Sequence, residues 1–190
     1  MKNVLEWLEI SKEKYPDKTV YSNLDYSLTF GQVSDIAKAV GSGLLAADIP
    51  SGPVAVIMGK EPKMIASYLG VAYSGRIYAP VDVTLPIKRL QSIFTNMCPA
   101  AVVTSAALLE KVQDILEKVG KGDVSVYTVE DLSQSTVDEA VLLAVREEMT
   151  ELTPLYIIYT SGSSGVPKGV VACHRNVICY IRAGAKLPKA

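Results

Sequence analysis

Short apolar runs typical of buried β-strands alternate along this 190-residue chain with segments whose apolar residues recur at helical spacing. Parallel strands need a helix-length crossover between them, whereas antiparallel strands can be joined by a tight turn. The alternation therefore predicts an α/β fold with a largely parallel sheet and helices on both of its faces. The runs that we interpret as strands of this sheet are PVAVIM (53–58), RIYAPVD (76–82), AAVVT (100–104) and VSVYTV (124–129).

Capping residues mark the predicted start of two helices. Thr29 and Gln32 form a capping-box pair, in which each side chain binds the backbone N–H of the other residue, ahead of an apolar stripe that begins at Val33. Thr136 and Glu139 form a second such pair before another apolar stripe. We therefore expect one helix to begin after Thr29 and another after Thr136.

The composition divides the chain into three predicted parts. Residues 1–129 carry the alternating pattern and form a first α/β sheet unit. Residues 130–153 form an acidic connector with a helix, because seven acidic residues and one basic residue fall between Glu130 and Glu151. Residues 154–190 hold a hairpin with a Gly/Ser-rich loop and the start of a second sheet unit.

The overall charge and the apolar pattern exclude several classes of protein. The 19 basic and 20 acidic residues give a formal net charge of -1, so the chain lacks the basic excess that a nucleic-acid partner requires. No apolar run approaches the roughly 18 residues of a membrane-spanning helix. Acidic residues near the start do not fit a signal peptide, and we expect a cytoplasmic protein.

Cysteine and histidine usage argues against covalent or metal stabilisation. The three cysteines contain no C-x-x-C pair and leave an odd thiol, which favours reduced cysteines over a disulfide framework. The one histidine cannot form a metal site by itself. We therefore expect no structural metal ion.

The segment PLYIIYTSGSSGVPKGVVACH (154–174) has the composition of a phosphate-binding loop. An apolar strand runs into Thr160 to Gly165, which offer four hydroxyls and two glycines within six positions. Glycines allow the backbone to approach a ligand and to point several N–H groups into one concavity, and hydroxyls add hydrogen-bond donors. Pro167 fixes the backbone beside Lys168, which adds a positive charge on a flexible stem.

Other interpretations of the glycine-containing segments fit less well. Gly162 to Lys168 does not match the P-loop spacing G-x-x-x-x-G-K-[ST], and Ser163 lacks the glycine two residues earlier that a serine-hydrolase nucleophile needs. Gly41-Ser42-Gly43 mimics part of a dinucleotide-binding fingerprint but lies late in a helical pattern. A flexible Ser/Gly surface turn remains the alternative to a phosphate-binding loop.

YTSGSSGVPKG (159–169) resembles the phosphate-loop signature of the adenylate-forming superfamily, which includes acyl-CoA synthetases, luciferases and amino-acid adenylation domains. The resemblance covers nearly the whole chain, since three further stretches agree in order and spacing: PDKTV (16–20) with LTFGQV (28–33), YLGVAYSGRIYAPVDVTLPIKRL (68–90), and VVACHRN (170–176). The run LPIKRLQSIFTN (85–96) is especially similar to ligases that load D-alanine onto a carrier protein. The residues that resemble the amino-acid-activating branch are Gly75, Tyr78, Pro80, Asp82, Pro86 and Arg89.

This resemblance implies a reaction and a set of binding residues. A carboxylate, most closely an amino acid, would react with ATP and Mg²⁺ to give an acyl-adenylate, which is transferred to the thiol of a carrier-protein phosphopantetheine arm or of CoA. The loop's natural role is electrostatic stabilisation of the departing pyrophosphate. The residues that the resemblance assigns to the β- and γ-phosphates of ATP are Thr160, Ser161, Gly162, Ser163, Ser164, Gly165 and Lys168.

Members of this superfamily are longer than this chain. Their adenine-binding motif, mobile C-terminal domain and main catalytic lysine have no assignable counterpart here, so we expect an N-terminal portion of the large domain that is inactive alone and has no assigned catalytic residue. Two alternatives stay open: a fragment of an acyl-CoA synthetase, or a non-catalytic association module of the same fold. Exposed apolar surface in such a module would favour a homo-oligomer.

Three other residues near these motifs are interpreted as structural. We expect Asp82 and Arg89 to form a structural pair at a helix start instead of acting in catalysis. We expect His174 to pack or cap where the next helix begins, and not to act as a general base.

Overall fold

The structure is a computed structural model that describes residues 1–161 and 167–184. Its strands, in chain order, are β1 (Thr19–Ser22), β2 (Ser27–Thr29), β3 (Val54–Ile57), β4 (Tyr78–Pro80), β5 (Ala101–Thr104), β6 (Val126–Thr128), β7 (Pro154–Ser161) and β8 (Pro167–Cys173). Its helices are α1 (Leu5–Lys14), α2 (Phe30–Ala46), α3 (Pro62–Tyr73), α4 (Ile87–Met97), α5 (Leu109–Lys118), α6 (Val129–Leu132), α7 (Glu139–Glu148) and α8 (His174–Gly184), with a 3₁₀ turn at Ala106–Leu108.

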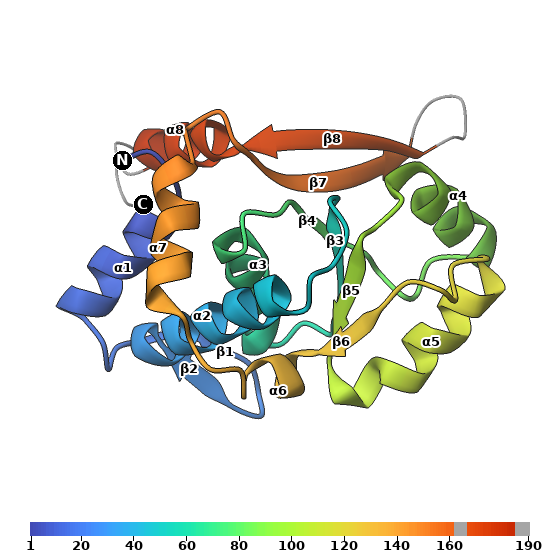
Figure 1. Cartoon of the computed structure of the whole chain (residues 1–190), viewed down its shortest axis with the longest axis horizontal. Helices are drawn as coiled ribbons and strands as arrows, with labels where there is room; N and C mark the ends of the chain where they lie inside the picture. The colour runs from blue at the N-terminus through green and yellow to red at the C-terminus, as the bar shows by residue number, and fades with distance from the viewer. Residues whose placement is uncertain (162–166, 185–190) are drawn as a thin grey trace.

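The main sheet has six strands in the order β6-β5-β3-β4-β7-β8 (Figure 1). The first five of these strands pair in parallel with their neighbours, and β8 runs antiparallel to β7. Strands β1 and β2 form a separate antiparallel hairpin. The predicted α/β fold with a largely parallel sheet is confirmed.

Strand β3 shows why the sheet needs helices on both faces. All four of its residues are buried, and their side chains alternate between two apolar clusters. Ala55 and Ile57 pack with residues of α4 and α5, whereas Val54 and Val56 pack with residues of α2, α3 and α6. The prediction that helices cover both faces is therefore also confirmed.

Helices α2 and α3 approach closely through glycines. A Cβ atom on Gly70 of α3 would lie 2.5 Å from Cγ1 of Val40 and 3.0 Å from the carbonyl oxygen of Ala37, both on α2. Gly41 of α2 is equally confined, since its Cβ would lie 2.7 Å from Cβ of Tyr73. Gly41 thus serves helix packing, in agreement with its rejection as part of a dinucleotide-binding fingerprint.

A group of ionic and hydrogen bonds centred on Glu9 joins four helices. The Glu9 carboxylate of α1 lies 3.1 Å from Nζ of Lys38 in α2 and 3.1 Å from a guanidinium nitrogen of Arg146 in α7. It also accepts a 2.6 Å hydrogen bond from the hydroxyl of Tyr73 in α3. Burial by itself would raise the pKa of Glu9, but these donors and positive charges lower it. The ion pair with Arg146 links α1 to α7, and the two helices lie side by side in Figure 1.

The second predicted capping box is wrong, whereas the first is confirmed. Thr29 and Gln32 exchange both hydrogen bonds at the start of α2. Helix α7 begins later than the Thr136–Glu139 pair requires, because the carboxylate of Asp138 accepts the N–H of Val141 at 3.0 Å. A carboxylate beside the first helical residue also interacts favourably with the helix dipole.

The Gly70 contact gives a test of the α2–α3 interface. We expect Gly70→Ala to lower the free energy of unfolding by about 2 kcal/mol, because the added methyl group collides with backbone and with a branched side chain. The measurement is the urea midpoint at an unchanged m-value.

Gly59→Ala is the matched control, because no atom lies within 4 Å of its Cβ position. We expect its stability to stay within about 0.5 kcal/mol of the wild type. Equal stabilities for the two variants would show that the interface tolerates a larger residue and that the close approach is not required.

Candidate functional site

The candidate phosphate-binding segment lies at the end of the β7–β8 hairpin. β7 pairs with β4 at Tyr156 and then continues beyond that point, paired with β8 as far as Ser161 and Pro167. The far part of the hairpin therefore extends past the parallel sheet toward α4 (Figure 1). Residues 162–166 connect its two strands.

The stem of the hairpin brings two predicted site residues together. Thr160 pairs directly with Lys168, and the Thr160 hydroxyl makes a long 3.5 Å contact with the carbonyl oxygen of Lys168. Directly paired residues of antiparallel strands project from the same face. The side chains of Thr160 and Lys168 therefore share one face of the stem, and both residues are exposed.

The predicted site residues divide between described and undescribed parts of the chain. Thr160, Ser161 and Lys168 lie at the end of the hairpin strands, with Ser161 paired to Pro167. The remaining predicted residues, Gly162, Ser163, Ser164 and Gly165, lie outside the described residues.

Lys168 differs from several other lysines in its electrostatic surroundings. None of the ion pairs formed within residues 1–161 and 167–184 includes Lys168. In contrast, Lys38, Lys63 and Lys118 each lie beside a carboxylate. In this part of the chain, the ammonium group of Lys168 is therefore available to an anion.

Tyr159 ties the stem to α4 and was missed by the sequence analysis. Its hydroxyl donates a 2.9 Å hydrogen bond to Oδ1 of Asn96. A Cβ atom on Gly169, the residue paired with Tyr159, would lie 3.2 Å from the tyrosine ring, so glycine leaves room for the ring to lie across β8. Burial, followed by the nearby Cys98 thiol, raises the pKa of Tyr159. No local pattern links Asn96 to a position 63 residues later.

The predicted pair of Asp82 and Arg89 is wrong. Asp82 instead accepts hydrogen bonds from the backbone N–H and the hydroxyl of Thr84, at 2.8 and 2.7 Å, and these bonds lower its pKa. Helix α4 begins only after Pro86, so Asp82 does not cap it. The local turn satisfies the carboxylate without Arg89, because a short Asp side chain bonds readily to the backbone two residues on.

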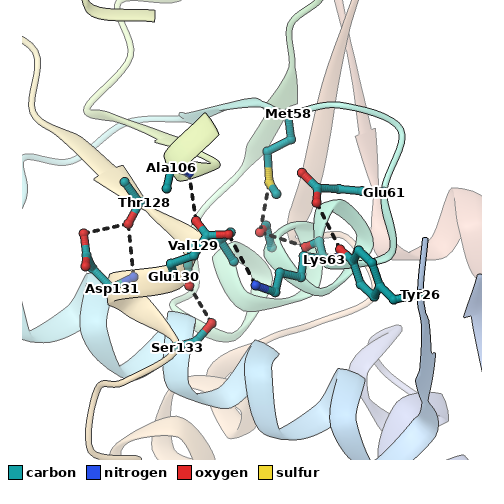
Figure 2. Close-up of polar contacts among 11 residues, drawn as sticks. Tyr26, Met58, Glu61, Lys63, Ala106, Thr128, Val129, Glu130, Asp131 and Ser133 are labelled. Atoms are coloured by element: carbon teal, nitrogen blue, oxygen red, sulfur yellow. Dashed lines mark hydrogen bonds and ion pairs between the residues drawn. The ribbon is translucent and has the colours of Figure 1, made fainter. Parts of the chain in front are cut away.

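A polar cluster occupies the carboxyl ends of β3, β5 and β6, where parallel sheets often bind ligands. Figure 2 shows Glu130 accepting the backbone N–H of Ala106 at 2.9 Å and facing Nζ of Lys63 at 3.3 Å. In the same cluster the Tyr26 hydroxyl donates to Glu61 at 3.0 Å. These charges and donors satisfy one another, so the cluster holds neighbouring segments together.

His174 lies at the start of α8 and is buried, with 1% of its surface exposed. Its Nδ1 atom accepts a 3.2 Å hydrogen bond from the backbone N–H of Val4, which joins α8 to the residue before α1. Burial lowers the pKa of His174 to about 4, so the ring is neutral near pH 7. The prediction that His174 packs where the next helix begins is confirmed.

The described part of the chain holds neither a metal-binding cluster nor a membrane-spanning helix. Residues 1–161 and 167–184 contain no group of three or more His, Cys, Asp or Glu side chains that could hold a metal ion. None of the helices within these ranges has the length and apolar character needed to cross a membrane.

The chain is similar in sequence to a described protein family and to several curated proteins. A model of the family described as AMP-binding enzyme matches residues 8–189. The chain is 35% identical over 169 residues to the D-alanine--D-alanyl carrier protein ligase of Bacillus velezensis, and the match covers 88% of the chain and 32% of that protein. It is 28% identical over 183 residues to gramicidin S synthase 2 of Brevibacillus brevis, and this match covers 96% of the chain and 4% of that protein. The chain therefore spans about a third of the length of the D-alanyl carrier protein ligases it matches.

Solved structures share the fold at low sequence identity. The N-terminal domain of FACL13 from Mycobacterium tuberculosis superposes with a TM-score of 0.81 at 23% identity, covering 100% of this chain and 49% of that one. The fatty acid AMP ligase from Legionella pneumophila gives a TM-score of 0.76 at 20% identity, covering 96% of this chain and 32% of that one. The architecture is thus that of the N-terminal domains of AMP-forming ligases.

The buried histidine predicts a dependence of stability on pH. The pKa of His174 is about 4 in the folded protein against an ordinary value of 6.5, so the unfolded chain takes up a proton first as the pH falls. We expect the free energy of unfolding to decrease between pH 6.5 and about 4, by up to about 1.4 kcal/mol per pH unit, and this contribution to level off below that range. Urea unfolding across the same pH range measures this change in the free energy of unfolding.

His174→Asn provides the control, because the amide oxygen can replace Nδ1 as an acceptor but cannot titrate. We expect this variant to lose about 1–2 kcal/mol near neutral pH through lost packing, and to show a shallower pH dependence than the wild type. If the free energy of unfolding changed with pH equally in both proteins, the pH dependence would not come from His174.

Proposed function

Because the chain belongs to the AMP-binding enzyme family, we propose that it forms the N-terminal portion of a ligase that uses ATP to activate a carboxylate as an acyl-adenylate. The observation that supports this best is the pairing of Thr160 with an exposed Lys168 at the end of a hairpin that is anchored in the sheet. In this proposal residues 1–129 form the first sheet unit and residues 130–153 the connector. Residues 154–190 carry the phosphate-binding hairpin, which joins the first sheet through β4 and β7, and begin a second unit.

The proposed reaction needs an anion site at the leaving group. An oxygen of the carboxylate attacks the α-phosphorus of ATP, the bond to the β-phosphate oxygen breaks, and pyrophosphate leaves with increased negative charge. Donors placed in advance at that charge lower the barrier. The residues proposed to bind the β- and γ-phosphates are Thr160, Ser161, Gly162, Ser163, Ser164, Gly165 and Lys168.

The surroundings of Lys168 support an anion site at the described end of the hairpin. The Lys168 ammonium is exposed and outside the ion pairs of the described residues, so binding an anion breaks none of those pairs. The Tyr159–Asn96 hydrogen bond holds the strand that ends in Thr160 and Ser161. Mg²⁺ would partly neutralise the phosphates of ATP. We assign it no ligand in this chain, since the described residues contain no group of three or more His, Cys, Asp or Glu side chains that could hold a metal ion.

The substrate that we propose is an amino acid, and the acceptor is the phosphopantetheine thiol of a carrier protein. The names of the similar curated proteins, a D-alanine--D-alanyl carrier protein ligase and a gramicidin S synthase, support this choice over a fatty acid with CoA. The acyl-CoA synthetase alternative rests on structures below 25% identity, which support the fold alone.

The phosphate site can be tested in the chain itself. We expect pyrophosphate to shift the NMR signals of residues at the hairpin end with a dissociation constant of about 1 mM or weaker, because adenine and ribose contacts are missing. Lys168→Ala should weaken this binding roughly tenfold, the effect of losing one charge-assisted hydrogen bond.

Lys88→Ala is the matched control, since Lys88 is also exposed but lies on α4. We expect it to bind pyrophosphate like the wild type. Micromolar ATP binding that survives Lys168→Ala would place the nucleotide elsewhere and overturn the assignment.

The proposed reaction also predicts the result of an ATP–pyrophosphate exchange assay. The 190-residue chain should give no exchange with amino acids or fatty acids, because it lacks most of the length of the ligases it resembles. The longer ligase that contains this segment should exchange with an amino acid such as D-alanine in preference to fatty acids. Exchange by the chain alone would contradict the view that it is only a portion of the enzyme.

A further inference from the structure

A cavity of about 320 Å³ lies between the first and last described helices, at a distance from the phosphate-binding end of the hairpin. It touches β7 only at Leu155, near the opposite end of that strand from Thr160. Its described wall consists of Val4, Trp7, Leu8, Ser11, Val20, Tyr21, Phe30, Val33, Ile65, Tyr68, Leu69, Tyr78, Leu155, Val177 and Ile181.

The described wall of this cavity is uncharged. Its residues are aliphatic or aromatic apart from Ser11 and the tyrosine hydroxyls, and they include no Lys, Arg, His, Asp or Glu. A carboxylate or phosphate placed here would lose part of its hydration without gaining a counter-charge from this wall. The cavity therefore favours a neutral ligand and disfavours the anionic reactants of the proposed ligase reaction.

Aromatic side chains form much of the described wall of the cavity. The rings of Tyr68 and Tyr78 stack with centroids 4.7 Å apart and an angle of 15° between their planes. Trp7 of α1 and Phe30 at the start of α2 also contribute rings to the wall. Aromatic rings of a ligand can pack against such side chains, either offset or edge to face.

The tyrosine hydroxyls of the wall supply hydrogen-bonding groups that the described protein does not use. Within residues 1–161 and 167–184, the tyrosine hydroxyls that bond to protein atoms are those of Tyr26, Tyr73 and Tyr159, and none of these lines the cavity. Half-buried tyrosine hydroxyls usually have a partner. Those of Tyr68 and Tyr78 are therefore available to an oxygen atom of a ligand.

We propose that this cavity binds a neutral aromatic alcohol of about two fused rings. An apolar cavity of about 150 Å³ holds one benzene molecule, so the volume here matches a bicyclic ligand. The uncharged wall favours a neutral ligand, the aromatic side chains of the wall favour an aromatic body, and the tyrosine hydroxyls without a partner among the described residues favour an oxygen atom. The site is independent of the phosphate-binding hairpin and of the function proposed for it.

Trp7 allows the site to be tested directly, since it is the single tryptophan of the chain and lines the cavity. A ¹⁵N-labelled sample gives one indole N–H signal, which can be followed during titration with 2-naphthol. We expect a saturable shift of this signal with 2-naphthol, and binding at least about tenfold weaker for 2-naphthoate, which carries a charge on the same rings.

Two variants separate filling of the cavity from recognition of the alcohol. Val177→Phe places a ring in the cavity and should abolish the saturable shift, whereas Val141→Phe is the control at an exposed position of α7 outside the wall. Tyr68→Phe keeps the stacked ring and removes one hydroxyl. It should weaken 2-naphthol about fivefold and leave 2-methylnaphthalene, which has no oxygen, unchanged.

The proposal is overturned if 2-naphthol gives no saturable shift, if Val177→Phe binds it like the wild type while remaining folded, or if 2-naphthoate binds equally well. Should Val177→Phe fail to fold, Tyr68→Phe still tests the proposal: equal effects of this change on the binding of 2-naphthol and of 2-methylnaphthalene would contradict recognition of the alcohol. Lys168→Ala should bind 2-naphthol normally, so failure of this site and failure of the phosphate site give different results.

Discussion

The burial of β3 and β5 on both faces is the constraint on which the rest of this structure depends. Every residue of these two short strands is buried, and neither strand has a polar face that could meet water. A sheet with such a centre is stable only between two layers of helices. Helices α4 and α5 supply one layer, and α2 with α3 supply the other. The glycines that let α2 and α3 approach, and the Glu9 network that fixes α1 and α7, complete the second layer.

The β7–β8 hairpin is not buried between two layers of helices as β3 and β5 are. β7 enters the sheet through one pair with β4, but the outer part of the hairpin carries exposed apolar side chains such as Ile158, Val170 and Val171. Beyond Tyr156 the described residues of this part have no pairing with β4. Its position depends on the pairing of β7 with β8 and on the Tyr159–Asn96 hydrogen bond. In the proposed function a stem held in this way keeps Thr160 and Lys168 in place, which reduces the entropic cost of binding an anion.

Periodicity in the sequence predicted the features that depend on local patterns. The apolar runs located the parallel strands, and the Thr29–Gln32 pair located the start of α2, because a capping box involves residues only three positions apart. The Thr136–Glu139 pair failed for the same local reason: Asp138 competes for the same N–H groups and lies beside the first helical residue. Asp82 shows a similar competition, in which a neighbouring turn supplied the bonds that had been assigned to a distant arginine.

Contacts between distant segments could not be predicted in this way. Asn96 meets Tyr159, and Val4 meets His174, across separations of 63 and 170 residues that carry no sequence signal of their own. The aromatic cavity likewise combines residues from both ends of the described chain. The motif predicted a set of phosphate-binding residues, which stays a prediction, whereas the stem that would position them depends on tertiary contacts.

The lysines of the described residues differ in whether they lie beside a carboxylate. Lys38 and Lys63 lie between secondary-structure elements and face carboxylates of Glu9, Glu139 or Glu130, so their charge is used in holding helices and loops together. Removing one partner from such a pair leaves a charge that is partly desolvated. Lys168 is exposed and stands outside the described ion pairs. An ammonium in that position contributes little to the fold. In the proposed function it attracts an anion to the hairpin end, and this attraction weakens as salt is added.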